Sequence, residues 1–236
     1  MELCSMNLNE ARALVASVPH WHHAFEIFPG LITPGTYQPA FLLEKTRLPS
    51  DLTGMRVLDI GTCDGFFALE LVRRGATVVA IDYRSKQAHG YHVMEQLNPV
   101  EIEYHQMNIY DLAEKPLGEF DIVLFLGVLY HLPDMIRALQ MIRERCRGTL
   151  FLETHSENDF CHSEAAARYY RGNTLALDHT NFWAPNRLCV LDMLYDTGFD
   201  VAREEAWGQR LFVEAKAVPV DGLRNTKMQI GYGLMG

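Results

Sequence analysis

The stretch that decides the fold is "VLDIGTCDGFFALEL", residues 57–71. It begins with a short apolar run that fits a strand buried on both faces, and it continues into apolar residues at helical spacing. Asp59, Gly61 and Gly65 lie around the turn between these two segments. Glycine lets a backbone approach a ligand closely, and open parallel sheets bind ligands outside the carboxyl ends of their strands. The stretch therefore predicts a strand, a ligand-binding turn and a helix.

The alternation of strands and helices continues along the middle of the chain. The strand-like runs are 55–61, 76–82, 100–108, 120–130 and 148–155, and the helix-like segments are 66–75, 85–98 and 133–146. This order implies a parallel sheet with helices on both faces. We therefore predict an α/β fold, a doubly wound Rossmann-like sheet.

The C-terminal part predicts a helix and a hairpin. The helix covers 185–199, and the runs 200–207 and 210–217 flank Gly208 as an edge hairpin. The segment between the fifth strand and this helix is long for a connection, and "SEAAARYYRG" (163–172) favours a helix within it. The expected organisation is a cap over residues 1–50, the main domain over 51–217 and a tail over 218–236.

The composition fits a globular protein. The net charge of −9 disfavours nucleic acid as a partner, because lysine and arginine drive binding to phosphates. No apolar run is long enough to span a membrane, and no signal peptide is visible at the N-terminus. The five cysteines are odd in number and form no C-x-x-C pair, which indicates free thiols and a cytoplasmic location. A monomer or a homodimer is expected.

Two common nucleotide-binding motifs do not fit the turn. A dinucleotide fingerprint needs G-x-G-x-x-G, but Cys63 and Phe66 occupy its second and third glycine positions. Phe66 would oppose the close packing of helix on strand that the third glycine permits. A Walker loop is excluded because the chain has no Gly-Lys-Ser/Thr sequence.

The pattern D-x-G-x-x-x-G, followed by Asp82 at the end of the second strand, resembles the cofactor site of class I S-adenosylmethionine-dependent methyltransferases. "MNIYDL" (107–112) and "LFLGVLYHLPD" (124–134) are similar to that family's segments after the third and fourth strands. The resemblance implies a seven-stranded sheet whose last strand is antiparallel, preceded here by a helical cap. It also implies S-adenosylmethionine as the cofactor.

The resemblance assigns the cofactor-binding residues. Asp59 orients the loop, Gly61, Cys63 and Gly65 approach the methionine part, and Asp82 accepts hydrogen bonds from the ribose hydroxyls. Asn108 faces the adenine amine and Ile109 its ring. The further cofactor contacts predicted in these segments and in the cap are Thr62, Phe66, Tyr83, Leu126, Gly127, Tyr130, Trp21 and Arg210.

From about residue 20 the chain looks like a narrower group, the tRNA wobble-uridine carboxymethyltransferases and their relatives. "GVLYH", "LFLETH" and "FWAPN" carry this resemblance. In that group a lysine, a tyrosine and an arginine hold the extra carboxylate of carboxy-S-adenosylmethionine. Tyr130 and Arg210 match the last two, but residues 13–44 contain no lysine or arginine, and His22 or His23 falls at the lysine position. Ordinary S-adenosylmethionine is therefore the predicted donor.

The candidate catalytic residues follow the fourth and fifth strands, beside the expected methyl group. His131 is a candidate general base for a hydroxyl acceptor, or a structural histidine that bonds nearby backbone. Tyr130 precedes it, and Glu153 and His155 end the fifth strand. Trp183 belongs either to an active-site wall or to a hydrophobic staple on the following helix.

The stretch "HWHHAFEIFPGLITPGTYQP" (20–39) precedes the first strand of the sheet. We expect it to fold across the carboxyl ends of the strands, with His22, His23 and Tyr37, together with Arg210, facing cofactor or acceptor. Its histidines do not converge on one helix face, and the cysteines and histidines of 155–179 match no regular zinc spacing. No metal site is predicted.

Methyl transfer to a small molecule, at oxygen, is the predicted function. The alternatives are a tRNA wobble-uridine modifying enzyme and a catalytically silent module that binds the cofactor. The shorter N-terminal region and the acidic charge favour a small-molecule acceptor over tRNA.

Overall fold

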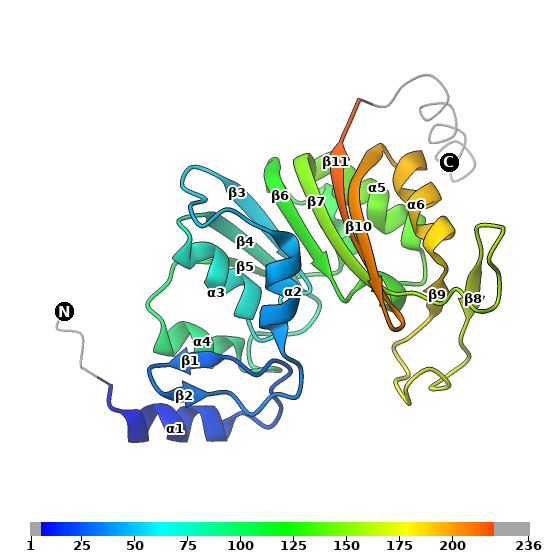
Figure 1. Cartoon of the computed structure of the whole chain (residues 1–236). Coiled ribbons are helices and arrows are strands. Elements are labelled where there is room, and N and C mark those ends of the chain that lie inside the picture. The colour runs from blue at the N-terminus through cyan, green and yellow to red at the C-terminus, as the bar shows by residue number, and fades with distance from the viewer. Residues whose placement is uncertain (1–5, 220–236) are drawn as a thin grey trace. The chain divides into compact units, whose positions relative to one another are not determined.

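The computed structural model describes residues 6–219 and divides the chain into two compact units, Met1–Asn108 and Ile109–Gly236 (Figure 1). Each unit has its own strands, helices and buried side chains. The expected tail (218–236) lies almost entirely outside the described residues.

The first unit is built on three parallel strands in the order β3-β4-β5. The elements are β3 (Arg56–Ile60), α3 (Phe66–Arg73), β4 (Thr77–Asp82), α4 (Tyr91–Leu97) and β5 (Glu103–Gln106). Nearly all residues of β3 and β4 are buried, as the continuous apolar runs predict for a parallel sheet. Helix α3 packs on both strands. The carboxyl ends of β3 and β4 therefore lie next to each other.

The N-terminal cap belongs to the same unit. Its elements are α1 (Leu8–Ser17), β1 (Glu26–Phe28), β2 (Leu31–Ile32) and α2 (Pro39–Thr46). Helix α1 begins at a capping box, in which Asn7 accepts from the Glu10 backbone N–H and Glu10 accepts from that of Asn7. Helix α1 packs against α4, and so does β1. The expected helical cap is present, and it also contains an antiparallel hairpin that the sequence pattern did not predict.

The main sheet of the second unit has four strands in the order β10-β11-β7-β6. Its sheet and helices are η1 (Ile109–Glu114), β6 (Phe120–Leu126), η2 (Leu129–His131), α5 (Met135–Arg145), β7 (Cys146–His155), α6 (Arg187–Asp196), β10 (Phe199–Trp207) and β11 (Arg210–Ala217). Strands β6 and β7 are parallel, and β11 is antiparallel to β7 and to β10. With the three strands of the first unit this gives the seven strands of the predicted Rossmann-like fold, mostly parallel with an antiparallel last strand.

The expected helix over 163–172 is wrong. The segment contains the strand β8 (Ala167–Tyr169), which pairs with β9 (Trp183–Pro185) in a separate two-stranded sheet. The alanines favour a helix locally, but backbone pairing to β9 and the hydrogen bonds of Arg168 and Tyr170 to Glu157 override that propensity.

Several other elements are shorter than expected, among them β5, α4 and β6. Helix α4 begins only at Tyr91, because Gly90 has a φ of 80° and interrupts the helical segment. The fourth strand ends at Leu126, and a short 3-10 helix, η2, carries residues 129–131. The second change lies at the end of a strand, where polar side chains of the expected site are located.

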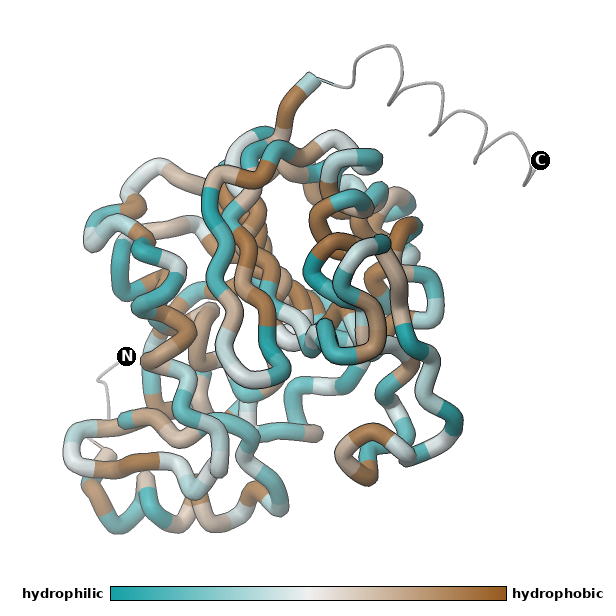
Figure 2. The backbone as a smooth tube through the Cα atoms, turned by 45° about the vertical axis from the view of Figure 1, so that its right-hand side comes forward, coloured by the Kyte–Doolittle hydropathy of each residue, from teal (hydrophilic) through white to brown (hydrophobic). Residues whose placement is uncertain are grey.

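The hydropathy of the chain follows these elements. Hydrophobic stretches run along the strands and hydrophilic stretches mark many turns (Figure 2). The largest fully buried side chains include Tyr91 and Leu58 in the first unit and Phe120, Phe125 and Phe212 in the second. Over residues 6–219, no helix is both long and apolar enough to cross a bilayer.

Candidate active site

The turn after β3 is held against the end of β4 by main-chain hydrogen bonds. The N–H groups of Gly61 and Thr62 donate to the Ile81 carbonyl at 2.8 and 3.2 Å. Gly65 has a φ of 86°, and a Cβ there would lie 2.5 Å from Met94 Cε. The glycines thus permit both the left-handed turn and close packing under it. These hydrogen bonds and contacts hold the backbone of residues 61–65 in its conformation.

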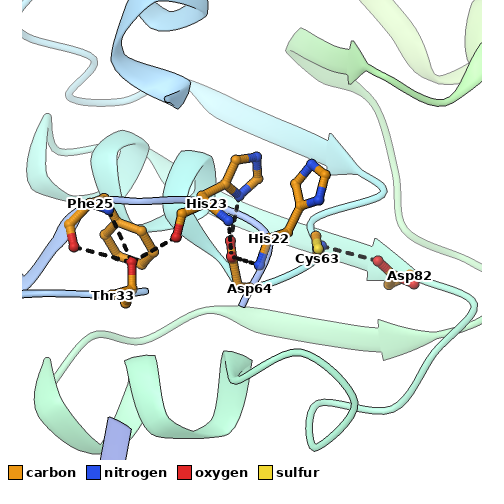
Figure 3. Close-up of polar contacts among 7 residues, drawn as sticks. All are labelled: His22, His23, Phe25, Thr33, Cys63, Asp64 and Asp82. Carbon is orange, nitrogen blue, oxygen red and sulfur yellow. Dashed lines mark hydrogen bonds and ion pairs between the residues drawn. The ribbon is translucent and has the colours of Figure 1, made fainter. Parts of the chain in front are cut away.

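Asp82 closes this loop from the end of β4. Its carboxylate accepts a hydrogen bond from the backbone N–H of Cys63 at 3.0 Å (Figure 3). It accepts a second one from the backbone N–H of Arg84 at 2.9 Å. The side chain is buried, and the Arg84 guanidinium lies 3.4 Å from it. A buried carboxylate with two backbone donors is held in one orientation, which suits it to accept further hydrogen bonds from a diol.

Cys63 adopts a conformation that favours glycine. Its φ is 55°, in the left-handed region that L-residues rarely occupy. Burial raises the pKa of its thiol, so the thiol is protonated and is no nucleophile. The contribution of Cys63 to the loop therefore comes from its backbone, whose N–H binds Asp82, and not from its sulfur.

Replacing Cys63 with glycine is expected to change the free energy of unfolding by less than about 1 kcal/mol. Relief of the left-handed conformation, about 1–2 kcal/mol, is offset by the greater chain entropy of unfolded glycine, about 0.5–1 kcal/mol. Cys63→Val should destabilise the fold, because a β-branched side chain fits this φ poorly. Urea unfolding of both variants measures the difference, and equal losses would contradict the argument.

Asp59 and Thr62 leave polar atoms unsatisfied beneath the loop. Asp59 Oδ2 and Thr62 Oγ1 are buried and make no hydrogen bond of regular geometry in this structure, although the Thr62 side chain is close enough to Asp59 to influence its pKa. Burial raises the pKa of Asp59 to about 6, an effect that the nearby Thr62 side chain partly offsets. Such orphaned groups are uncommon in proteins and indicate a bound polar group or ordered water. The loop therefore fits a ligand that approaches closely and brings hydrogen bonds.

Asp64 ties the cap to the loop. One carboxylate oxygen accepts the backbone N–H groups of His22 and His23 at 3.1 and 2.7 Å, and the other lies 2.5 Å from His23 Nδ1 (Figure 3). Asp64 is fully buried, and His23 is 6% exposed. A buried carboxylate with three hydrogen bonds holds its partners strongly. The sequence analysis did not single out Asp64, and its position between Cys63 and Gly65 was the available signal.

The cap backbone is braced at the same point. Tyr37 donates its N–H to the His22 carbonyl, and the Thr33 hydroxyl donates to the His23 carbonyl at 2.7 Å. A Cβ on Gly35 would lie 2.2 Å from the His23 carbonyl carbon, so only glycine fits there. The His22-His23 segment is therefore fixed against the loop by the cap itself.

His22 carries no positive charge at neutral pH. Burial of its ring, and then the adjacent His23, lower its pKa to about 4, although the residue as a whole is exposed. Its ring stacks on that of Tyr37 with centroids 5.5 Å apart. The predicted cap residues His22, His23 and Tyr37 thus form one cluster, and its outermost histidine is neutral.

The structure places the other predicted residues of the first unit as follows. Trp21 is buried, donates its indole N–H to the Val15 carbonyl and packs on Gly90, so packing accounts for its position. Tyr83 is exposed and lies against the Arg84 guanidinium. Asn108 is exposed. Phe66 is buried against Phe25 at the start of α3. For all four of these residues, a contact with the cofactor stays a prediction.

In the second unit Arg210 and Glu153 form a buried ion pair. The guanidinium makes two hydrogen bonds to the Glu153 carboxylate, one of them 2.6 Å long, and Glu153 is fully buried. Although burial alone would lower it, the pKa of Arg210 is raised, because Glu153 stabilises the charge. The guanidinium also lies over the Tyr130 ring, 5.0 Å from its centroid. The charge of Arg210 is therefore already compensated within the protein.

His155 belongs to a second polar cluster at the end of β7. Its Nε2 lies 3.1 Å from Glu157, which also accepts from Arg168 and Tyr170 of the segment around β8. Glu157 is buried, yet these hydrogen bonds and charges keep its pKa below the ordinary value. The cluster fastens the β8 segment to the end of β7.

His131 lies on η2, with its ring centroid 4.0 Å from that of Tyr130. Its Nδ1 is 2.9 Å from the Thr180 hydroxyl and 3.2 Å from the Thr180 carbonyl oxygen.

The other predicted residues of the second unit have local partners. Trp183 donates its indole N–H to the Pro133 carbonyl. Leu126 ends β6, and Gly127, which follows the strand, donates its N–H to the Glu153 carbonyl. Ile109 is buried in η1. Of the predicted residues of this unit, Tyr130, His131, Glu153, His155 and Arg210 lie close together.

Comparison with known proteins decides the family. A family model described as "Methyltransferase domain" matches residues 13–204. The chain belongs to this family. The methyltransferase is 35% identical over 108 residues to a magnesium-protoporphyrin O-methyltransferase of Rhodobacter capsulatus, a match that covers 44% of the chain and 47% of the relative. It thus spans about half the length of that curated relative.

One further relative and one solved structure cover more of the methyltransferase. It is 30% identical to a ubiquinone biosynthesis O-methyltransferase of Aeromonas salmonicida (strain A449) over 172 residues, 66% of the chain and 70% of the relative. The crystal structure of the N-terminal domain of EvdMO1 with SAH bound has a TM-score of 0.67 at 18% identity, and covers 90% of the chain and 97% of that domain. The likeness to the EvdMO1 domain shows the fold of the chain. The predicted methyltransferase family is confirmed, and the narrower tRNA group stays a prediction.

The methyltransferase shows no cluster of histidine, cysteine, aspartate and glutamate suited to a metal ion among residues 6–219. The histidines of the cap instead contact Asp64, Tyr37 and one another. The sequence analysis also missed Thr180 and Asp178, which lie in the long segment after β7, and no motif pointed to them.

Proposed function

We propose that this methyltransferase transfers a methyl group from S-adenosylmethionine to a hydroxyl oxygen of a small-molecule acceptor. The observation that carries the proposal is the loop of the first unit. Its glycines, its two orphaned polar atoms and the buried Asp82 carboxylate together offer close backbone approach and a hydrogen-bond acceptor for a ribose. The relatives named O-methyltransferases support the choice of oxygen.

The chain's own residues would hold the cofactor in three ways. Asp82 accepts hydrogen bonds from the ribose hydroxyls, because both its oxygens are already oriented by backbone donors. The backbone of Gly61, Cys63 and Gly65 lines the methionine part, and Asp64 keeps the cap on the loop. When bound, the cofactor supplies an electrophilic methyl group. The protein then mainly positions the reactants and provides a base.

The charges of the two units favour the plain cofactor over its carboxylated form. His22, at the position of the lysine in the narrower group, is neutral because its pKa is about 4. Arg210 is bound to Glu153 on two of its nitrogens. Neither residue therefore offers an uncompensated positive charge to an additional carboxylate, and burying an unpaired charge costs free energy.

Calorimetry of the full chain tests the cofactor. We expect S-adenosylmethionine to bind at least about tenfold more tightly than carboxy-S-adenosylmethionine, a difference of about 1.4 kcal/mol. Transfer is then followed as S-adenosylhomocysteine released in the presence of hydroxylated small molecules, with a parallel sample of bulk tRNA. Tighter binding of the carboxylated cofactor, with product on tRNA, would establish the tRNA function instead. Binding without turnover on any acceptor would favour a silent module.

A further inference from the structure

His131 faces a hydroxyl and a carbonyl of the same residue. Thr180 Oγ1 lies 2.9 Å and its carbonyl oxygen 3.2 Å from His131 Nδ1, although the two residues are 49 positions apart. The Thr180 hydroxyl also lies 2.7 Å from Asp178 Oδ1. Three side chains, His131, Thr180 and Asp178, thus form a continuous chain of hydrogen bonds within the second unit.

The direction of each hydrogen bond follows from the carboxylate. Although burial alone would raise it, the pKa of Asp178 is lowered, mainly by hydrogen bonds from the Thr180 side chain and backbone N–H. An ionised carboxylate only accepts, so the Thr180 hydroxyl donates to Asp178. Its oxygen then offers a lone pair to Nδ1, as the carbonyl oxygen does. Both neighbours of Nδ1 therefore require a proton on that nitrogen.

We propose that Thr180 and Asp178 are positioning residues that hold the proton of neutral His131 on Nδ1, so that Nε2 is the basic nitrogen of the imidazole. This inference rests on the proposed function, since it assigns His131 as the general base. The acceptor oxygen gives its proton to Nε2 and bonds to the methyl carbon, while the electron pair of the broken carbon–sulfur bond goes to sulfur. The imidazolium formed is stabilised by Asp178 through the hydroxyl.

The backbone before Asp178 supports a specific role for it. Ala176 and Leu177 have φ values of 53° and 59°, so two successive residues other than glycine are left-handed. Each costs about 1–2 kcal/mol, and such conformations concentrate at functional sites. The Leu175 carbonyl accepts from the Asp178 N–H and from the side chain of the buried Asn181, which holds this turn. The strained turn is what presents the carboxylate to Thr180.

Charged groups also lie on the elements that pack against η2 and on their neighbours. They are Glu153 and His155 from β7, Arg210 from β11 through the Tyr130 ring, Asp134 at the start of α5, and His179 on the loop of Asp178. Glu153 is compensated by Arg210, and His155 by Glu157. Asp178 is linked to the imidazole by hydrogen bonds through a hydroxyl. Its removal should therefore disfavour the imidazolium.

Nitrogen NMR of the ¹⁵N-histidine-labelled full chain tests the arrangement without any acceptor. We expect neutral His131 to carry its proton on Nδ1, and Thr180→Val to move its protonation to lower pH. Thr180→Ser should restore the wild-type titration. Thr174→Val, which removes an exposed hydroxyl of the same loop, is the matched control. A proton on Nε2, or an unchanged titration in Thr180→Val, would overturn the proposal.

Kinetics provide the second measurement once an acceptor is known. Thr180→Val and Asp178→Asn should each lower kcat about tenfold, a modest part of what a general base contributes, with KM and cofactor affinity retained. The acid limb of the pH profile should move to lower pH. A structural role would instead change stability or KM and leave the limb in place, which would refute the positioning role. Absence of methyl transfer despite the expected NMR result would refute the proposed function and not the hydrogen-bond chain.

Discussion

Replacing Asp82 with alanine is expected to weaken S-adenosylmethionine binding by about 100-fold or more. The carboxylate is buried at the end of β4 and held by the N–H groups of Cys63 and Arg84. Hydrogen bonds from two ribose hydroxyls to a charged acceptor contribute about 1.5–3 kcal/mol each, so their loss amounts to at least about 3 kcal/mol. Isothermal titration calorimetry measures the change directly.

Two variants separate the ribose contact from other effects of this substitution. Asp82→Asn keeps an oxygen for a backbone donor but loses the charge, so an intermediate loss of affinity is expected. Glu101→Ala removes an exposed carboxylate of the same unit and should leave binding unchanged. If Asp82→Ala bound the cofactor as tightly as the wild type, the assignment of Asp82 to the ribose would be wrong.

Replacing Asp64 with alanine should lower the free energy of unfolding by about 3 kcal/mol and also weaken cofactor binding. The change leaves the buried N–H groups of His22 and His23 without their acceptor, and each unsatisfied buried group costs about 1–3 kcal/mol. The cap would no longer be tied to the loop, so the loop would lose its fixed course. Urea unfolding and calorimetry on the same preparation measure the two effects.

Asp64→Asn is the informative companion variant. Its amide oxygen can still accept both backbone N–H groups, whereas its contact with His23 Nδ1 loses the charge. It should therefore lie between the wild type and Asp64→Ala in stability, with Glu101→Ala again as the neutral control. A loss below about 1 kcal/mol in Asp64→Ala would show that the cap is held mainly by other contacts, such as those of Thr33.

Much of the fold was predictable because its signals are local. The apolar runs of β3 and β4, the glycine turn and the periodic segment of α3 occupy a few consecutive residues each, and burial on both faces leaves little choice of structure. The prediction of a helix over 163–172 was wrong because a contact with a distant segment decided the structure there. Its alanines give a weak local preference, and pairing with a strand more than ten positions away decided the outcome.

The candidate site was predictable only in its residue types and their places at strand ends. Arg210 was a candidate clamp for a carboxylate of the ligand. In the structure its positive charge is compensated by Glu153, which lies 57 positions away in the chain. His131 was a candidate base, and Thr180, 49 positions away, determines which of its nitrogens is basic. No local pattern encodes such pairs.

The sequence by itself therefore determined the order of strands, the glycine loop, the Asp82 carboxylate and with them the methyltransferase family, because each depends on residues that are neighbours in the chain. Only the tertiary structure decided how those groups are partnered. It placed Asp64 under the cap, Glu153 on Arg210 and Thr180 on His131. The physical reason is that burial demands a partner for every charge and hydrogen-bonding group, and folding supplies those partners from distant parts of the chain.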